Sequence, residues 1–215
     1  MTKRRFFVLG LGKFGKRAAL YLRGIYKDRV IGVDPRTENV KWARERGIEA
    51  HLGDGISFLL DPPSKIEGED YLIPALPIHL AAYWLLAKRH RELELKIAPL
   101  PSHILSRLPH PIPLPDNSCA TSYATFICPE DCKEGRFCPK LGLKRGIPLY
   151  EFLRDLGTEA DFVYVIRSRQ LGPGMGGYKT EELLKLMDLP LDKEKPIILA
   201  TSCRCHGILS KIVVY

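Results

Sequence analysis

Short apolar runs alternate with amphipathic stretches along the first half of the chain. The apolar runs predict strands at residues 6–9, 30–33, 48–50, 71–73 and 93–98. Apolar positions that recur every three or four residues predict helices at 13–23, 37–46, 56–60 and 78–88. Strands that alternate with helices at this spacing predict an α/β fold with a doubly wound parallel sheet.

The first connection between a strand and a helix spells G-x-G-x-x-G, with Gly10, Gly12 and Gly15. In a dinucleotide-binding turn, the first glycine permits the tight turn and the second lets the backbone approach a pyrophosphate. The third glycine lets the helix pack close to the strand. Lys13 and Phe14 begin the helix, whose free N–H groups and partial positive charge attract phosphates. The turn therefore predicts a binding site for the phosphates of a dinucleotide.

An acidic residue, Asp34, closes the second predicted strand, 19 residues after Gly15. At this distance a carboxylate accepts hydrogen bonds from the ribose diol of NAD and repels the 2′-phosphate of NADP. The acid makes the pattern more specific than the glycines alone. We therefore predict NAD(H) as the cofactor. The alternative is a nucleotide-free domain that keeps the turn for packing.

Several segments of the first ninety residues resemble the nucleotide-binding domains of potassium channel and transporter regulators, the RCK or KTN type. These segments are Gly10–Gly15, Val30–Pro35, Val40–Ile48 and Gly53–Gly55. The resemblance covers about residues 4–90. It implies that the glycine turn holds the phosphates, that Asp34 binds the adenosine ribose and that Asp54 lies beside the nucleotide. It also implies that Arg36 can stack on the adenine.

Proline marks a change in composition after these segments, because six prolines fall between residues 99 and 115. This density predicts an extended connector. Beyond it, the pattern predicts helices at 149–156 and 181–187 and strands at 162–166, 196–200 and 208–214. We therefore predict a Rossmann dinucleotide-binding domain at 1–98, a connector at 99–118 and a cysteine-rich, metal-binding α/β portion at 119–215.

All six cysteines lie in this last portion, and clustered thiols in a reducing cytoplasm favour a metal over disulfides. The predicted metal ligands are Cys128, Cys132, Cys138, Cys203 and Cys205. Proline follows Cys128 and Cys138, a habit of iron–sulfur ligands, so we favour a [4Fe–4S] cluster. Zinc is the alternative, although the spacing is irregular for it. Cys119 and His206 are further candidates to complete the site.

The glycine-rich stretch at residues 171–180 nearly spells a P-loop. Tyr178, however, separates the last glycine from Lys179, and the lysine of a P-loop must follow the glycine directly. We therefore expect a loop that binds an anion, acts as a mobile lid or simply connects a strand to a helix. His79 begins the predicted buried helix and is expected to be a structural histidine. No catalytic triad or Cys-His order stands out, so the sequence indicates no catalytic residue.

Positive charge is concentrated around the glycine turn. Residues 1–46 hold 13 Lys or Arg and 4 Asp or Glu, whereas residues 47–215 hold 20 and 21. The excess can attract an anionic cofactor, or it can simply be the solvated face of two helices. No basic motif with interleaved aromatic residues is present, so we do not expect a nucleic-acid partner.

The chain begins with charged residues and shows no signal peptide. Its longest uncharged run, residues 71–87, is interrupted by Pro74 and Pro77 and is shorter than the roughly 20 apolar residues of a membrane span. We therefore expect a cytoplasmic protein. Glutamine occurs once and asparagine twice, a scarcity that indicates a heat-adapted source.

These features together predict an NAD(H)-binding protein with a cysteine-ligated metal centre. It would act as a redox or ligand sensor, alone, as a homodimer or with a protein partner, or as a small oxidoreductase. The oxidoreductase hypothesis has less support, because electron transfer from NADH to a cluster normally needs a flavin and the sequence shows no flavin signature. The alternative, which follows from the resemblance, is a regulatory nucleotide-binding subunit of a cation transport system with a structural zinc site.

Overall fold

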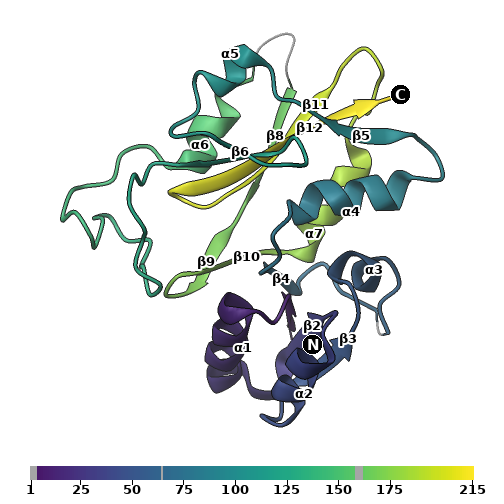
Figure 1. Cartoon of the computed structure of the whole chain (residues 1–215), viewed down its shortest axis with the longest axis vertical. Coiled ribbons are helices and arrows are strands. Elements are labelled where there is room, and N and C mark those ends of the chain that lie inside the picture. Colours follow the sequence, from purple (N-terminus) through teal and green to yellow (C-terminus); the bar gives the residue numbers. More distant parts are fainter. Residues whose placement is uncertain (1–3, 64, 158–161) are drawn as a thin grey trace.

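The computed structural model describes residues 4–63, 65–157 and 162–215, whose strands form two sheets (Figure 1). Within these residues the order of the N-terminal sheet is β3-β2-β1-β4-β10-β9. The order of the second sheet is β6-β7-β12-β11-β8, and β5 also pairs with β12. No helix of the described part is both long and apolar enough to cross a membrane.

The N-terminal sheet is mostly parallel. Its strands are β1 (Phe6–Leu9), β2 (Val30–Asp34), β3 (Glu49–Leu52), β4 (Tyr71–Pro74), β9 (Arg169–Gly172) and β10 (Met175–Lys179). The first four strands pair in parallel, with β1 between β2 and β4. The hairpin of β9 and β10 joins the free edge of β4 in antiparallel orientation. The α/β class is confirmed, but the sheet is mixed and not purely parallel.

Four helices cover the parallel part of this sheet. They are α1 (Lys13–Tyr26), α2 (Thr37–Arg44), α3 (Gly55–Leu60) and α4 (Leu80–Arg89). Phe6 and Val8 of β1 pack in one core with Leu22 of α1, whereas Phe7 and Leu9 belong to a separate core. Because neighbouring residues of a strand point to opposite faces, β1 is buried on both sides. This explains its unbroken apolar sequence.

The second sheet combines strands from three distant parts of the chain. They are β5 (Leu95–Ala98), β6 (Ile112–Pro113), β7 (Cys119–Ser122), β8 (Phe162–Arg167), β11 (Ile197–Ser202) and β12 (His206–Val214). The sequence predicts β5 as a fifth strand of the parallel sheet, and this prediction is wrong. β5 pairs antiparallel with the end of β12, because β10 already occupies the edge of β4.

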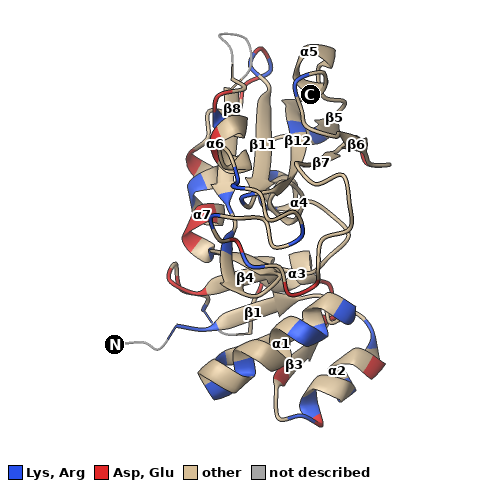
Figure 2. Cartoon of the chain, turned by 90° about the vertical axis from the view of Figure 1, so that its left-hand side faces the viewer, with Lys and Arg blue, Asp and Glu red and all other residues tan. Residues whose placement is uncertain are grey.

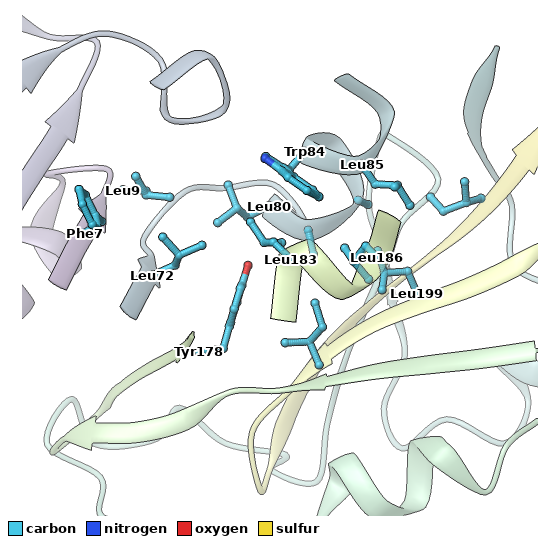
Figure 3. Packing of buried hydrophobic residues seen from close by; sticks show 14 of the residues in the cluster. Phe7, Leu9, Leu72, Leu80, Trp84, Leu85, Tyr178, Leu183, Leu186 and Leu199 are labelled. Carbon is cyan, nitrogen blue, oxygen red and sulfur yellow. The ribbon is translucent and has the colours of Figure 1, made fainter. Parts of the chain in front are cut away.

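One apolar core connects the two sheets (Figure 3). Leu72 of the first sheet, Trp84 of α4 and Leu199 of the second sheet all belong to it, together with Leu183 of α7 (Thr180–Leu184). The helix α4 is apolar on most sides because it packs between the sheets. The predicted division at 1–98, 99–118 and 119–215 stays a prediction.

The far side of the second sheet is covered by α5 (Ser102–Leu105) and α6 (Leu149–Arg154). The helix α5 lies within the predicted extended connector, so that prediction is wrong in part. Leu100, Ile104 and Leu108 are buried there in the core of the second sheet. Proline obscured this amphipathic turn in the sequence, although proline is well tolerated just before and in the first turn of a helix.

The glycine-rich stretch is likewise not a loop, because most of it lies in the strands β9 and β10. A Cβ atom at Gly177 would lie 2.6 Å from the carbonyl oxygen of Leu72, so glycine lets β10 lie against β4. Gly174 forms the turn with a φ of +65°. Glycines lack the alternating side chains that identify a strand, which is why the sequence predicts a loop here.

Candidate functional site

Two of the three glycines in the turn are required by the fold itself. Gly10 has a φ of +91°, and a Cβ atom there would lie 2.5 Å from the carbonyl oxygen of Ala75. A Cβ atom at Gly15 would overlap the carbonyl oxygen of Gly10. Both positions therefore exclude any larger residue whether or not a ligand binds.

Gly12, in contrast, faces open space. Its φ is −70°, which any residue can adopt, and the nearest atom to a Cβ there is Nη2 of Arg36, 3.9 Å away. Gly12 is the N-cap of α1, where no side chain of the described residues caps the helix and no acidic residue lies in the first turn. The N-terminus of α1 is therefore free to receive an anion.

Asp34 lies beside this turn and is buried, with 3% of its side chain exposed. Its Oδ1 accepts hydrogen bonds from the backbone N–H of Arg36 at 2.9 Å and from Nδ2 of Asn39 at 3.0 Å. Its Oδ2 accepts one from the N–H of Leu11 at 2.6 Å. Burial alone would raise the pKa of Asp34, but hydrogen bonds from Asn39, Leu11 and Arg36 outweigh it and lower the pKa. The carboxylate thus fixes the glycine turn against β2, a role that the sequence reading missed.

The two residues singled out by the family resemblance also have structural contacts. Asp54 caps α3, since its Oδ1 accepts a hydrogen bond from the N–H of Ser57 at 2.8 Å. Arg36 is 58% exposed, and its Nε lies 3.4 Å from Oδ1 of Asp34. This leaves the guanidinium of Arg36 beside the open space above Gly12. The nucleotide contacts predicted for Asp54 and Arg36 stay predictions.

A large, mainly apolar cavity of about 1310 Å³ begins next to the turn. Its wall on the side of the N-terminal sheet includes Phe14 of α1, Pro74 at the end of β4 and residues 76–80. The opposite wall comes from the loop that follows β7 and from the turn between β11 and β12. The strands β2 and β3 lie on one side of β1, and β4 lies on the other. In open α/β sheets, ligands bind at the carboxyl ends of the strands where the strand order reverses in this way, which here is between β1 and β4.

Comparison with known proteins finds a family match in the N-terminal part of the chain and another in the C-terminal part. Residues 6–60 match the TrkA-N domain, and residues 81–214 match a family described as "Uncharacterized protein, C-terminal domain". An Archaeoglobus fulgidus protein described as "Uncharacterized protein" is 30% identical over 223 residues, covering 95% of this chain and 97% of the relative. The chain therefore belongs to the family of this C-terminal domain and of the Archaeoglobus fulgidus protein. No solved structure matches it.

The TrkA-N match confirms the resemblance to RCK nucleotide-binding domains over residues 6–60, which include the glycine turn, Asp34 and Asp54. The segment from residue 61 to about 90, over which we extended the resemblance, lies outside the TrkA-N match. Lys and Arg residues, blue in Figure 2, occur along the helices α1 and α2 of this domain. Ten of the 13 Lys and Arg residues in the first 46 positions therefore lie within the TrkA-N match.

A loop of the C-terminal portion is fastened to the first turns of α1 in the TrkA-N domain. The carboxylate of Glu130 pairs with Nζ of Lys13 and lies 3.2 Å from Nη1 of Arg17. Nη2 of Arg17 donates to the carbonyl of Gly174 at 3.2 Å, and the N–H of Gly174 donates to the carbonyl of Cys132 at 2.7 Å. The predicted phosphate site is thus directly linked to this loop, the cysteine loop, which carries Cys128 and Cys132. Sequence reasoning missed Glu130, although it lies between two predicted metal ligands.

The five predicted thiol ligands all line the cavity, and none of the six cysteines of the chain forms a disulfide. The imidazole of His206 lies between two of them, with Nε2 3.5 Å from Sγ of Cys128 and Nδ1 3.8 Å from Sγ of Cys203. Burial raises the pKa of Cys203 to about 12, and the charge of Glu134 adds to this. Cys119 instead lies in β7 within the core of the second sheet.

Among the residues that the structure describes, no three or more His, Cys, Asp or Glu side chains are grouped closely enough to hold a metal ion as they stand. A metal centre therefore stays a prediction. Phe14, which lies between Gly12 and Gly15 in the turn, lines the same cavity as the five thiols.

His79 also lines the cavity but is only 1% exposed. Its Nδ1 lies 2.8 Å from Oγ of Ser210, and its Nε2 lies 3.0 Å from Oγ1 of Thr201. Burial lowers the pKa of His79 to about 3, although the charge of Asp116 acts in the opposite direction. Both ring nitrogens have partners in the second sheet, so the expectation of a structural histidine is confirmed.

Proposed function

We propose that this protein binds NAD(H) across the N-terminus of α1 and acts as a redox or ligand sensor. The observation that carries the proposal is the open space at Gly12. Two glycines of the turn are explained by packing, whereas nothing among the residues that the structure describes requires a glycine at position 12. A pyrophosphate that approaches the backbone there would supply the reason, as in other dinucleotide-binding turns.

The remaining parts of the cofactor follow from the position of the pyrophosphate. On one side lie Asp34, which would accept hydrogen bonds from the adenosine ribose, and Arg36, which would cover the adenine. Asp54 would lie beside the same half of the nucleotide. On the other side the cavity begins at Phe14, so the nicotinamide half would enter it at the carboxyl end of β4. We further propose that the thiol-lined wall holds a metal centre, an iron–sulfur cluster in the redox version of the sensor.

Titration calorimetry with NADH and NADPH tests this proposal. We expect NADH to bind more tightly, because the buried carboxylate of Asp34 would repel a 2′-phosphate. A preference for NADPH, or no binding of either nucleotide, would contradict it.

A sensor and a small oxidoreductase can be separated by turnover. A sensor should bind NADH without consuming it and change its oligomeric state, whereas an enzyme should oxidise NADH when an electron acceptor is supplied. The link from Lys13 through Glu130 to the cysteine loop supports the sensor, because a ligand at the turn can alter the loop without chemistry. The TrkA-N match also supports a second candidate, a regulatory subunit of a cation transport system with a structural zinc site.

The variant Glu130→Gln is expected to bind NADH about two- to tenfold more tightly than the wild type. The carboxylate of Glu130 engages Lys13 and Arg17, which would otherwise face the phosphates. Removing exposed ion pairs of this kind changes binding only modestly. Calorimetry measures the effect.

Asp131→Asn is the matched control, since it removes the next carboxylate along the loop, which forms no ion pair within the described residues. Equal gains for both variants would mean that the general loss of negative charge, and not the link to α1, is responsible. An unchanged affinity for Glu130→Gln would show that Glu130 does not compete with the nucleotide.

A further inference from the structure

A chain of hydrogen-bonded side chains runs from the cavity along the second sheet and ends at a carboxylate. Thr201 lines the cavity, and its Oγ1 lies 3.0 Å from Nε2 of His79. Nδ1 of His79 lies 2.8 Å from Oγ of Ser210, which lies 2.6 Å from Oγ of Ser118. The hydroxyl of Ser118 lies 3.2 Å from Oδ2 of Asp116. These residues come from distant segments, so only the folded protein brings them together.

The inner members of this polar chain are shielded from water. His79 and Ser118 are each 1% exposed, and Ser210 is fully buried. Among the residues that the structure describes, their side chains form hydrogen bonds only with the neighbouring members of the polar chain. A buried polar hydrogen without an acceptor is costly, so each hydrogen has to be shared within the polar chain.

The polar chain has one direction, because each hydroxyl carries one hydrogen and a carboxylate only accepts. The hydroxyl of Ser118 donates to Asp116, since otherwise two acceptors would face each other at 3.2 Å. Ser210 must then donate to Ser118, and Nδ1–H of His79 must donate to Ser210. Burial lowers the pKa of His79 to about 3, so the ring is neutral and its Nε2 accepts from the hydroxyl of Thr201.

The hydroxyl of Thr201 therefore has no hydrogen left for the cavity and can only accept there. The strand β11 fixes its position, because Thr201 pairs with Ile166 of β8 and with Ile208 of β12. Apolar side chains such as Ile78 and Ile208 line the cavity around it. In such surroundings a ligand with an N–H or O–H group directed at Thr201 would be favoured over one without it.

We infer that Thr201 accepts a hydrogen bond from the ligand of the cavity, and that Asp116 sets this polarity from the far end of the polar chain. The ligand is thus one that carries an amide or hydroxyl donor. The carboxamide of nicotinamide is such a group, and this assignment rests on the proposed NAD(H) site. Thr201 contacts the ligand, whereas Asp116 and His79 are positioning residues. His79 directly precedes α4, on the connection that leaves the carboxyl end of β4, where the nicotinamide would enter.

The variant Asp116→Asn is expected to reverse the polar chain. The backbone N–H of Ser118 lies 3.0 Å from Oδ1 of Asp116, so an asparagine would keep its oxygen there and direct its NH2 group at the hydroxyl of Ser118. Because that group donates, every hydrogen bond beyond it changes direction. Nε2–H of His79 would then donate to Thr201, whose own hydrogen would become free for the cavity.

Nitrogen NMR spectroscopy of the full chain with isotope-labelled histidine tests this directly. We expect His79 to be protonated at Nδ1 in the wild type and at Nε2 in Asp116→Asn, and His79→Gln identifies its signals. Tyr83→Phe is the matched control, because the hydroxyl of Tyr83 donates to Oδ2 of Asp116 at 3.0 Å but is not part of the polar chain. It should keep the proton on Nδ1. A wild type protonated at Nε2, or an Asp116→Asn variant that keeps Nδ1–H, would overturn the inference.

Calorimetry tests the ligand by comparing NADH with its acetylpyridine analogue, in which a methyl ketone replaces the carboxamide and its N–H donors. We expect the wild type to bind NADH about two- to tenfold more tightly than the analogue, the effect of one hydrogen bond. Thr201→Val and Asp116→Asn should lose this preference, and Tyr83→Phe should keep it. Equal binding of the two nucleotides by the wild type, or a preference that survives in Thr201→Val, would overturn the carboxamide assignment.

The failure of this inference and the failure of the NAD(H) proposal give different results. A wild type that binds neither nucleotide would refute the NAD(H) site and the carboxamide assignment together. The tautomer of His79 is measured without nucleotide, so it decides in either case whether Asp116 sets the polarity of Thr201.

Discussion

Replacing Gly12 with valine is expected to weaken NADH binding at least about 100-fold, or about 2.7 kcal/mol, while the fold stays intact. The backbone at Gly12 has a φ of −70°, and a Cβ atom there has 3.9 Å of clearance from the nearest atom. The Cβ atom therefore meets no clash in the protein, whereas it would occupy the space that a pyrophosphate in contact with the backbone needs. Calorimetry and thermal unfolding measure the two effects, and we expect Tm to change by no more than about 2 °C.

Gly24→Val is the matched control, because Gly24 lies on the same helix and a Cβ atom there meets nothing within 4 Å. We expect this variant to bind NADH like the wild type. If Gly12→Val also binds normally, the pyrophosphate does not lie against the turn. If it unfolds, the open space at Gly12 is required for packing and no longer argues for a ligand.

Acidification is expected to destabilise the protein through His79, by about 2 kcal/mol at pH 5 relative to neutral pH. Burial lowers the pKa of His79 to about 3, whereas the unfolded chain takes up the proton near pH 6.5. The unfolded state therefore binds more protons between these values. The contribution of His79 to stability is complete above pH 6.5 and is lost progressively as the pH falls toward 3.

The variant His79→Gln should flatten this dependence, because glutamine does not titrate, at the cost of lower stability at neutral pH. Chemical unfolding between pH 7.5 and 5 measures the slopes. His206, whose pKa is also lowered by burial, should leave a residual slope. His90→Gln, at an exposed position, should behave like the wild type. Equal slopes for His79→Gln and the wild type would show that His79 does not remain neutral in the folded state.

The parallel part of the N-terminal sheet is predictable from sequence because its signals are local. The strand β1, the glycine turn, α1 and β2 follow one another within thirty-four residues, and each has its own pattern of apolar positions. The family match at residues 6–60 covers the same segment. What the sequence does not reveal here is that Asp34 is occupied by contacts to Leu11 and Asn39, since these depend on the folded turn.

The pairing of distant segments is not predictable in the same way. The strand β5 follows a helix, as in a parallel sheet, yet it pairs with β12 because β10 returns to the edge of β4. Nothing in the apolar pattern of β5 distinguishes these two edges. The hairpin of β9 and β10 is hidden further by its glycines, which carry no side chains to alternate.

The arrangement of the cysteines is only partly predictable from the sequence. Their spacing predicts one metal site; Cys128, Cys132 and Cys138 line one cavity with the later pair, and the metal site itself stays a prediction. Cys203 and Cys205 lie two residues apart at the turn between β11 and β12, so sequence distance does not say which one faces the others. The fold places Sγ of Cys203 3.8 Å from Nδ1 of His206, a contact that no sequence spacing predicts.

The most direct test of the account is a crystal structure of the protein with NADH. We expect the pyrophosphate against the backbone at Gly12, the adenosine ribose within hydrogen-bonding distance of Asp34, and the nicotinamide in the cavity beyond Phe14. A glycine turn left empty at saturating NADH, or a nicotinamide that points away from the cavity, would contradict it.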